Sequence, residues 1–169
     1  QRRLFGVDVR SGRVDALSGD GSVAGFGVGP GAVVFARQHL ASPAQLFAVD
    51  LRGRGERQLT RHNAALLEEV AFGAYEQFSF PGAGGQTVYG WVVKPAGFEP
   101  GERYPVAFIV HGGPQGSMGN SFHYRWNPQT YAGKGYAVVF IDFHGSTGYG
   151  QEFTNSITGD WGGKPLEDL

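Results

Sequence analysis

The sequence contains no cysteine, a single methionine and no long apolar run. Without cysteine there is no disulfide, no thiolate metal site and no Cys nucleophile. No apolar stretch approaches the roughly 18 residues of a membrane-spanning helix, and residues 1–30 lack a signal-peptide core, so we expect no membrane partner. The compartment stays open between cytoplasm and periplasm.

An excess of charge of one sign is also missing. The chain has 14 Lys and Arg against 15 Asp and Glu, a formal net charge of −1. This balance gives no electrostatic reason to expect nucleic acid as a partner. The histidines show no metal-ligand spacing with one another or with carboxylates, so we expect no metal. They are His39, His62, His111, His123 and His144.

The residues that are present indicate a packed globular protein. Of 169 residues, 41% are hydrophobic and 17% are charged, which suits one domain or parts of two. The 29 glycines follow no strict period, which excludes collagen. Because residue 1 is Gln rather than Met, we expect the natural N-terminus to lie upstream.

The first third of the chain contains a repeat. Residues 4–9 match residues 46–51, and Leu17-Ser18 match Leu59-Thr60, both at an offset of 42 residues. Short strands that recur every 40–45 residues or so are typical of β-propeller blades, although any antiparallel meander would also fit. We expect strands over residues 4–9, 14–17 and 32–36.

The pattern changes in the second part of the chain. Alternating residues predict a hairpin, and two apolar runs predict strands buried in a parallel sheet, joined by a short helix as in a βαβ unit. The helix is expected to start at Asn127-Pro128 and to end by Gly133 or Gly135. The strands are expected over residues 75–80, 87–93, 106–110 and 137–141, and a further helix opens at residues 163–165.

A glycine turn follows the apolar strand at residues 106–110. Open α/β sheets place their ligands at this end of a parallel strand, and backbone N–H groups in a His-Gly-Gly turn can face a developing oxyanion. We expect the N–H of Gly113, rather than that of Gly112, to be the donor. His111 would orient the turn or face the site, or it would make a simple structural hydrogen bond. A plain glycine turn is the alternative.

No serine in the chain fits the Gly-x-Ser-x-Gly nucleophile elbow. Ser117 and Ser146 are near misses, because each lacks the leading glycine of that motif. Residues 145–150 fit a rigid turn beside an active site better than the start of a helix. We therefore expect the nucleophile to lie outside this chain.

Two residues are candidates for substrate binding. Arg125 lies among aromatic residues and could bind a carboxylate or carbonyl, or could merely stack and pair within its domain. Tyr149 lies in the turn expected beside the active site.

These motifs together resemble the prolyl oligopeptidase family of serine peptidases, most of all its acylaminoacyl-peptidase and dipeptidyl-peptidase branch. The matching residues are Lys94-Pro95, Tyr104-Pro105 and those at 111–114, 133–136, 145–150 and 160–162. Members with Tyr in place of His111 use its hydroxyl in the oxyanion hole, so the resemblance assigns that role here to the Gly113 backbone. Many members have Arg in place of His144, and any role of that Arg does not carry over.

The resemblance implies an α/β-hydrolase N-terminal part preceded by the last blades of a β-propeller, divided as residues 1–65 and 66–169. It implies a catalytic Ser, Asp and His beyond Leu169, acyl-enzyme hydrolysis of short peptides, and no cofactor. The remainder of the catalytic domain would be a partner, and a homo-oligomer is left open. The chain alone is expected to be inactive.

Two other functions stay open at this stage. An esterase or lipase could use the same turn, although the blade repeat argues against it. A propeller binding module with an inactive hydrolase domain would require that the Ser, Asp or His be missing. The residues do not decide between release of acylated amino acids and release of dipeptides.

Overall fold

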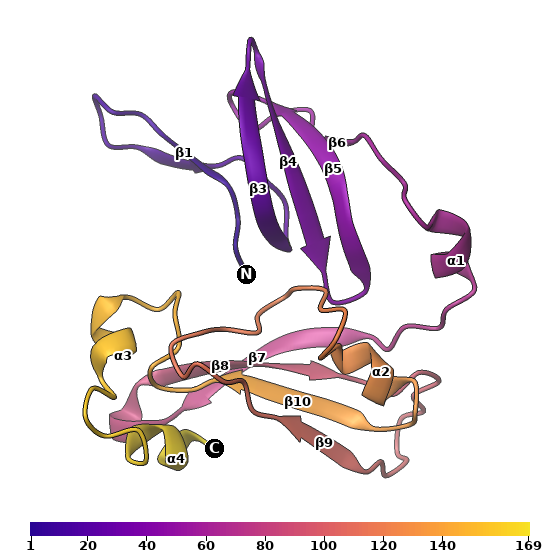
Figure 1. Cartoon of the computed structure of the whole chain (residues 1–169), viewed down its shortest axis with the longest axis vertical. Coiled ribbons are helices and arrows are strands. Elements are labelled where there is room, and N and C mark those ends of the chain that lie inside the picture. The colour runs from indigo at the N-terminus through magenta and orange to yellow at the C-terminus, as the bar shows by residue number, and fades with distance from the viewer. The chain divides into compact units, whose positions relative to one another are not determined.

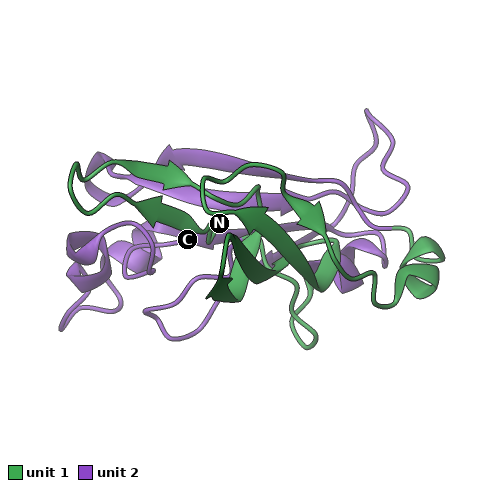
Figure 2. Cartoon of the chain, turned by 90° about the horizontal axis from the view of Figure 1, so that it is seen from above, with its two compact units in different colours: residues 1–71, 120–127 green, residues 72–119, 128–169 purple.

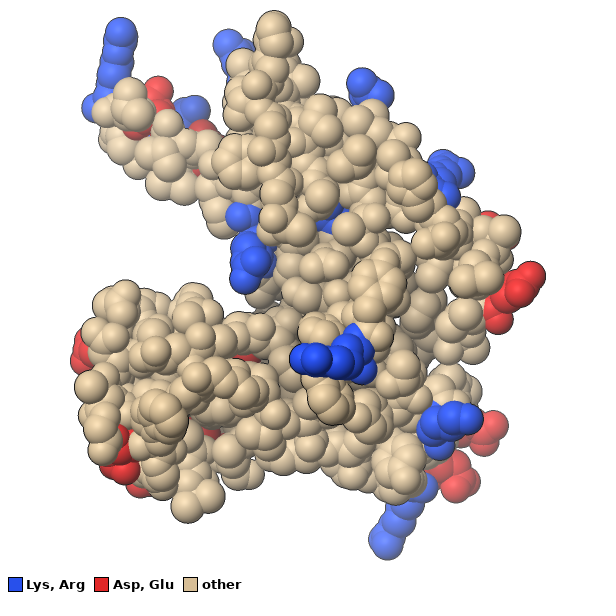
Figure 3. All heavy atoms as spheres, viewed as in Figure 1, with Lys and Arg blue, Asp and Glu red and all other residues tan.

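The computed structural model describes residues 1–169, which form two compact units. The first unit comprises residues 1–71 and 120–127, and the second comprises residues 72–119 and 128–169 (Figure 2). These units are defined by contacts within the chain, and the expected domain boundary between residues 65 and 66 stays a prediction. On the face seen in Figure 3, charged side chains stand singly or in small groups among uncharged residues.

The first unit is built from antiparallel β-structure (Figure 1). One sheet pairs β1 with β2, and a second has the order β3-β4-β5-β6. Its core consists of Leu4, Leu17, Val23, Val33, Phe35 and Val49. The elements are β1 (Phe5–Val7), β2 (Val14–Ala16), β3 (Ser22–Gly29), β4 (Ala32–His39), β5 (Ser42–Asp50), β6 (Arg57–Gln58) and α1 (Ala64–Glu68).

The sequence repeat is matched by a structural repeat. The β1–β2 and β5–β6 pairs share one register, because Phe5 lies opposite Ala16 just as Phe47 lies opposite Gln58. The Leu4 N–H donates to Ser18 Oγ at 2.9 Å, and the equivalent Leu46 N–H donates to Thr60 Oγ1 at 2.9 Å. The matching residues therefore make the same hydrogen bonds in both copies.

The second unit contains a four-stranded mixed sheet with the order β7-β8-β10-β9. Strands β9 and β10 are parallel, and the other neighbours are antiparallel. The predicted hairpin, the helix at residue 128 and the C-terminal helix are confirmed. The elements are β7 (Tyr75–Pro81), η1 (Ala83–Gly85), β8 (Thr87–Val93), β9 (Val106–Ile109), α2 (Pro128–Ala132), β10 (Ala137–Asp142), α3 (Gln151–Asn155) and α4 (Lys164–Asp168). These helices are all short, and none has the length and hydropathy of a membrane span.

The prediction that residues 106–110 form a strand buried in the sheet is wrong for this structure. Strand β9 has one neighbour, β10, and Val106, Phe108 and Val110 are 63%, 42% and 51% exposed. The buried strand is β10, in which Val138 and Phe140 are almost inaccessible. An apolar run predicts a strand that can be buried, but it does not reveal which neighbouring elements pair with that strand or cover it.

Candidate functional site

The glycine turn begins directly after β9. Gly113 has a φ of +135°, which L-residues rarely adopt, and a Cβ there would lie 3.0 Å from the Gln115 nitrogen. A Cβ at Gly112 would meet no atom within 4 Å. Neither the Gly112 nor the Gly113 N–H donates a hydrogen bond within the chain. The turn thus presents two free backbone donors at the end of a parallel strand.

The His111 ring contacts both this turn and the loop after β10. Its Nδ1 lies 3.1 Å from the Gly112 carbonyl oxygen, and its Nε2 lies 3.0 Å from Ser146 Oγ. The ring also stacks on Phe143, with centroids 4.4 Å apart. Because a carbonyl oxygen only accepts, Nδ1 carries the hydrogen in the neutral ring, and Nε2 accepts from Ser146.

These groups do not form a catalytic triad. In a triad the acid binds the histidine nitrogen that the serine does not use. Here the nearest carboxylate oxygen, Asp142 Oδ1, lies 3.8 Å from Nε2 of His111, the same nitrogen that contacts Ser146. The Ser146 side chain is also inaccessible to solvent. The arrangement is therefore a buried polar network and not a nucleophile with its base.

Asp142 is the centre of this network, and sequence reasoning missed it. Its Oδ2 accepts hydrogen bonds from Ser117 Oγ at 2.7 Å and from the Tyr149 hydroxyl at 2.6 Å. Burial, together with the nearby Asp142 carboxylate, raises the pKa of Tyr149 well above its usual value. A carboxylate at the end of a buried apolar strand was the one signal in the sequence that could have indicated this site.

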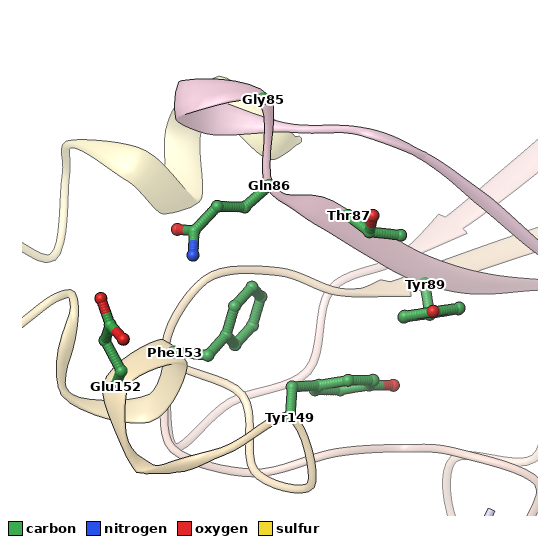
Figure 4. Close-up of a pocket in the computed structure, with 7 residues that line it drawn as sticks. All are labelled: Gly85, Gln86, Thr87, Tyr89, Tyr149, Glu152 and Phe153. Atoms are coloured by element: carbon green, nitrogen blue, oxygen red, sulfur yellow. The ribbon is translucent and has the colours of Figure 1, made fainter.

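Tyr149 also lines an open pocket of about 440 Å³ (Figure 4). Its ring lies parallel to that of Tyr89, with centroids 5.5 Å apart. Gln86, Glu152 and Phe153 gather at the other end of the pocket. Because Asp142 engages the Tyr149 hydroxyl, Tyr149 lines the pocket with its ring rather than with a free hydroxyl.

A second buried network lies at the end of β10. His144 Nδ1 is 2.6 Å from Asp168 Oδ2, and His144 Nε2 is 2.8 Å from Gln86 Oε1. Asp168 also accepts from the backbone N–H groups of His144 and Ala83. Neither this network nor any other part of the chain groups three His, Asp or Glu side chains as a metal site would.

Arg125 lies in the 120–127 segment, which belongs to the first unit, whereas His111, Gly113 and Tyr149 all lie in the second. Its guanidinium carbon lies 5.6 Å from the centroid of the Trp126 ring. The side chain is exposed, and the stacking alternative that the sequence left open is the contact that the structure contains.

Comparison with known proteins identifies the family. Residues 122–169 match the model of the prolyl oligopeptidase family. The chain belongs to this serine peptidase family, as the resemblance in the sequence predicted.

Particular members are similar over nearly the whole chain. Dipeptidyl-peptidase 5 of Schizosaccharomyces pombe is 37% identical, with 98% of this chain and 24% of that protein covered. Dipeptidyl-peptidase 5 of Trichophyton equinum is 42% identical, with 89% and 21% covered. A solved acylaminoacyl peptidase in complex with Z-Gly-Gly-Phe-chloromethyl ketone matches with a TM-score of 0.81 at 30% identity, with 94% of this chain and 25% of that chain covered. The Pyrococcus horikoshii acylaminoacyl peptidase matches with a TM-score of 0.80 at 30% identity and the same coverage. The chain spans about a quarter of the length of these relatives.

Proposed function

We propose that the chain is part of a serine peptidase that hydrolyses short peptides through an acyl-enzyme. Residues 1–65 would be the last blades of a β-propeller, and residues 66–169 would be the first part of an α/β-hydrolase domain. The 42-residue repeat with its shared hydrogen bonds supports the first assignment. The parallel β9–α2–β10 unit supports the second.

In this proposal the glycine turn supplies part of the oxyanion hole. The observation that carries it is the free N–H of Gly113 at the end of β9, held in a conformation that suits glycine. A hydrogen bond from such a donor strengthens as the carbonyl oxygen of the scissile bond gains negative charge. The nucleophilic Ser, with its His and Asp, would come from outside these residues.

The proposal also gives roles to the two candidate binding residues. Arg125 would bind a carboxylate or carbonyl of the peptide, because its guanidinium is exposed and permanently charged. Tyr149 would contact the substrate through its ring, which lines the pocket of Figure 4. Short peptides are the proposed substrates, since the relatives are named dipeptidyl-peptidase and acylaminoacyl peptidase.

Two neighbouring glycines provide a matched test of the turn. In the natural full-length protein, Gly113→Ala would place a methyl group against Gln115 and force the backbone away from a φ of +135°. We expect kcat/KM for peptide p-nitroanilides to fall by about 100-fold or more, which is the usual effect of losing one oxyanion donor.

Gly112→Ala is the control, because a Cβ there meets open space. This variant should keep kcat/KM within about threefold of the wild-type value, since the N–H groups remain and nothing is displaced. Equal losses in the two variants, or full activity of Gly113→Ala, would remove Gly113 from the proposed role. Comparing N-acetylaminoacyl with free dipeptidyl anilides as substrates would distinguish the two kinds of release.

A further inference from the structure

The carboxylate of Asp142 is buried and lies between the two loops at the candidate site. Asp142 ends β10 and is 4% exposed. Its Oδ2 accepts from two hydroxyls at 2.7 and 2.6 Å, distances typical of charge-assisted bonds to an ionised carboxylate. A single oxygen atom therefore holds two side chains at once.

These two side chains come from two different loops. Ser117 closes the stretch that begins at His111, and Tyr149 lies in the loop after β10. A backbone hydrogen bond from Thr147 to Gly116, at 2.9 Å, joins the same two loops. The position of the turn thus depends on the loop after β10, and Asp142 links the two loops together with the Ser146–His111 contact.

The other oxygen of Asp142 has no hydrogen-bond partner. Oδ1 is fully buried, and Nε2 of His111 lies 3.8 Å from it. Burying a carboxylate oxygen without a hydrogen-bond donor lowers the stability of the fold. Stability alone therefore does not explain a carboxylate at position 142. An apolar residue at this position would avoid that cost but could not hold Ser117 and Tyr149.

We propose that Asp142 is a positioning residue for the oxyanion turn, an inference that rests on the proposed function. It holds Ser117 and Tyr149 on one oxygen, and its second oxygen faces His111, whose ring in turn contacts Gly112. The carboxylate acts through the turn and does not touch the substrate.

The test is Asp142→Asn in the natural full-length protein. The amide keeps the size of the side chain but removes the charge that strengthens both hydroxyl bonds. We expect kcat to fall by about 100-fold while KM changes by less than about threefold, as when reacting groups are slightly misplaced. Hydrogen exchange of peptides covering residues 111–119 should become faster.

Asp168→Asn is the matched control, because Asp168 is also a buried carboxylate but bonds His144 and Ala83 instead of the turn. It should lower Tm, leave kcat per folded molecule within about threefold, and leave exchange at residues 111–119 unchanged. Ser117→Ala and Tyr149→Phe should each lower kcat, and their double variant should lose less than the product of the two effects.

The proposal is overturned if Asp142→Asn lowers Tm as Asp168→Asn does and keeps kcat, because the role would then be structural alone. It is also overturned if exchange at residues 111–119 stays unchanged. A wild-type protein that hydrolyses no peptide anilide would refute the proposed function, and the exchange measurement would still decide whether Asp142 positions the turn.

Discussion

At the residue scale, glycines determine the shape of the loops around the candidate site. Gly145 and Gly148 lie in the loop after β10, with φ values of +96° and +102°. A Cβ at Gly145 would collide with Ile157, whereas a Cβ at Gly148 would meet no atom within 4 Å. An L-residue would meet a similarly unfavourable φ at either position, so the two positions differ in packing.

This difference gives a prediction for the stability of the natural protein. Gly148→Ala should lower the free energy of unfolding by about 1–3 kcal/mol, the cost of an unfavourable φ for an L-residue. Gly145→Ala should lower it by about 1–3 kcal/mol more, because the methyl group overpacks Ile157. Denaturant unfolding of both variants measures the difference, and equal losses would contradict the packing described for Ile157.

The candidate site could be predicted from sequence only in part. Gly113 and His111 directly follow an apolar strand, so a local motif was enough to single them out. The partnership of Asp142 with Ser117 spans 25 residues and depends on how two loops meet, and no local pattern carries that information. Arg125 was chosen for its charge among aromatic residues, a pattern that also fits simple stacking.

At the element scale, the hairpin was predictable because its signal is local, and the repeat was predictable because the same short motif recurs 42 residues later. Strand β3 was missed because glycines alternate along it, and glycine is rare in strands. Phe26 and Val28 in β3 are exposed. The apolar residues of this strand therefore do not form a buried face. The sequence did not predict that β9 pairs with β10 alone, because strand pairing depends on the neighbouring strands and not on the residues of β9 itself.

The His144–Asp168 pair makes a prediction about how α4 is held. Asp168 is in α4, and its carboxylate binds His144 after β10 and the first residue of η1. Asp168→Ala should lower the free energy of unfolding by about 3–5 kcal/mol, because the buried His144 loses its carboxylate partner. Glu167→Ala, in the exposed position before it, should change the free energy by no more than about 0.5 kcal/mol. Similar values for the two variants would show that the pair does not hold α4.

At the scale of the whole molecule, we expect the chain to be one contributor to a larger active site. Ser146 is buried against His111, and Ser117 donates to Asp142, so neither is an available nucleophile. The polypeptide of residues 1–169 alone should therefore hydrolyse no peptide p-nitroanilide. Robust turnover by the purified polypeptide would contradict the account.

The most direct measurement is to label the natural full-length protein with a fluorophosphonate, which reacts with activated serines, and to locate the label by mass spectrometry. We expect one labelled serine outside residues 1–169, and loss of peptide anilide hydrolysis in proportion to labelling. A label on Ser117 or Ser146 would contradict the account, because the nucleophile would then lie within these residues. The absence of both label and hydrolysis would instead favour a binding module with an inactive hydrolase domain.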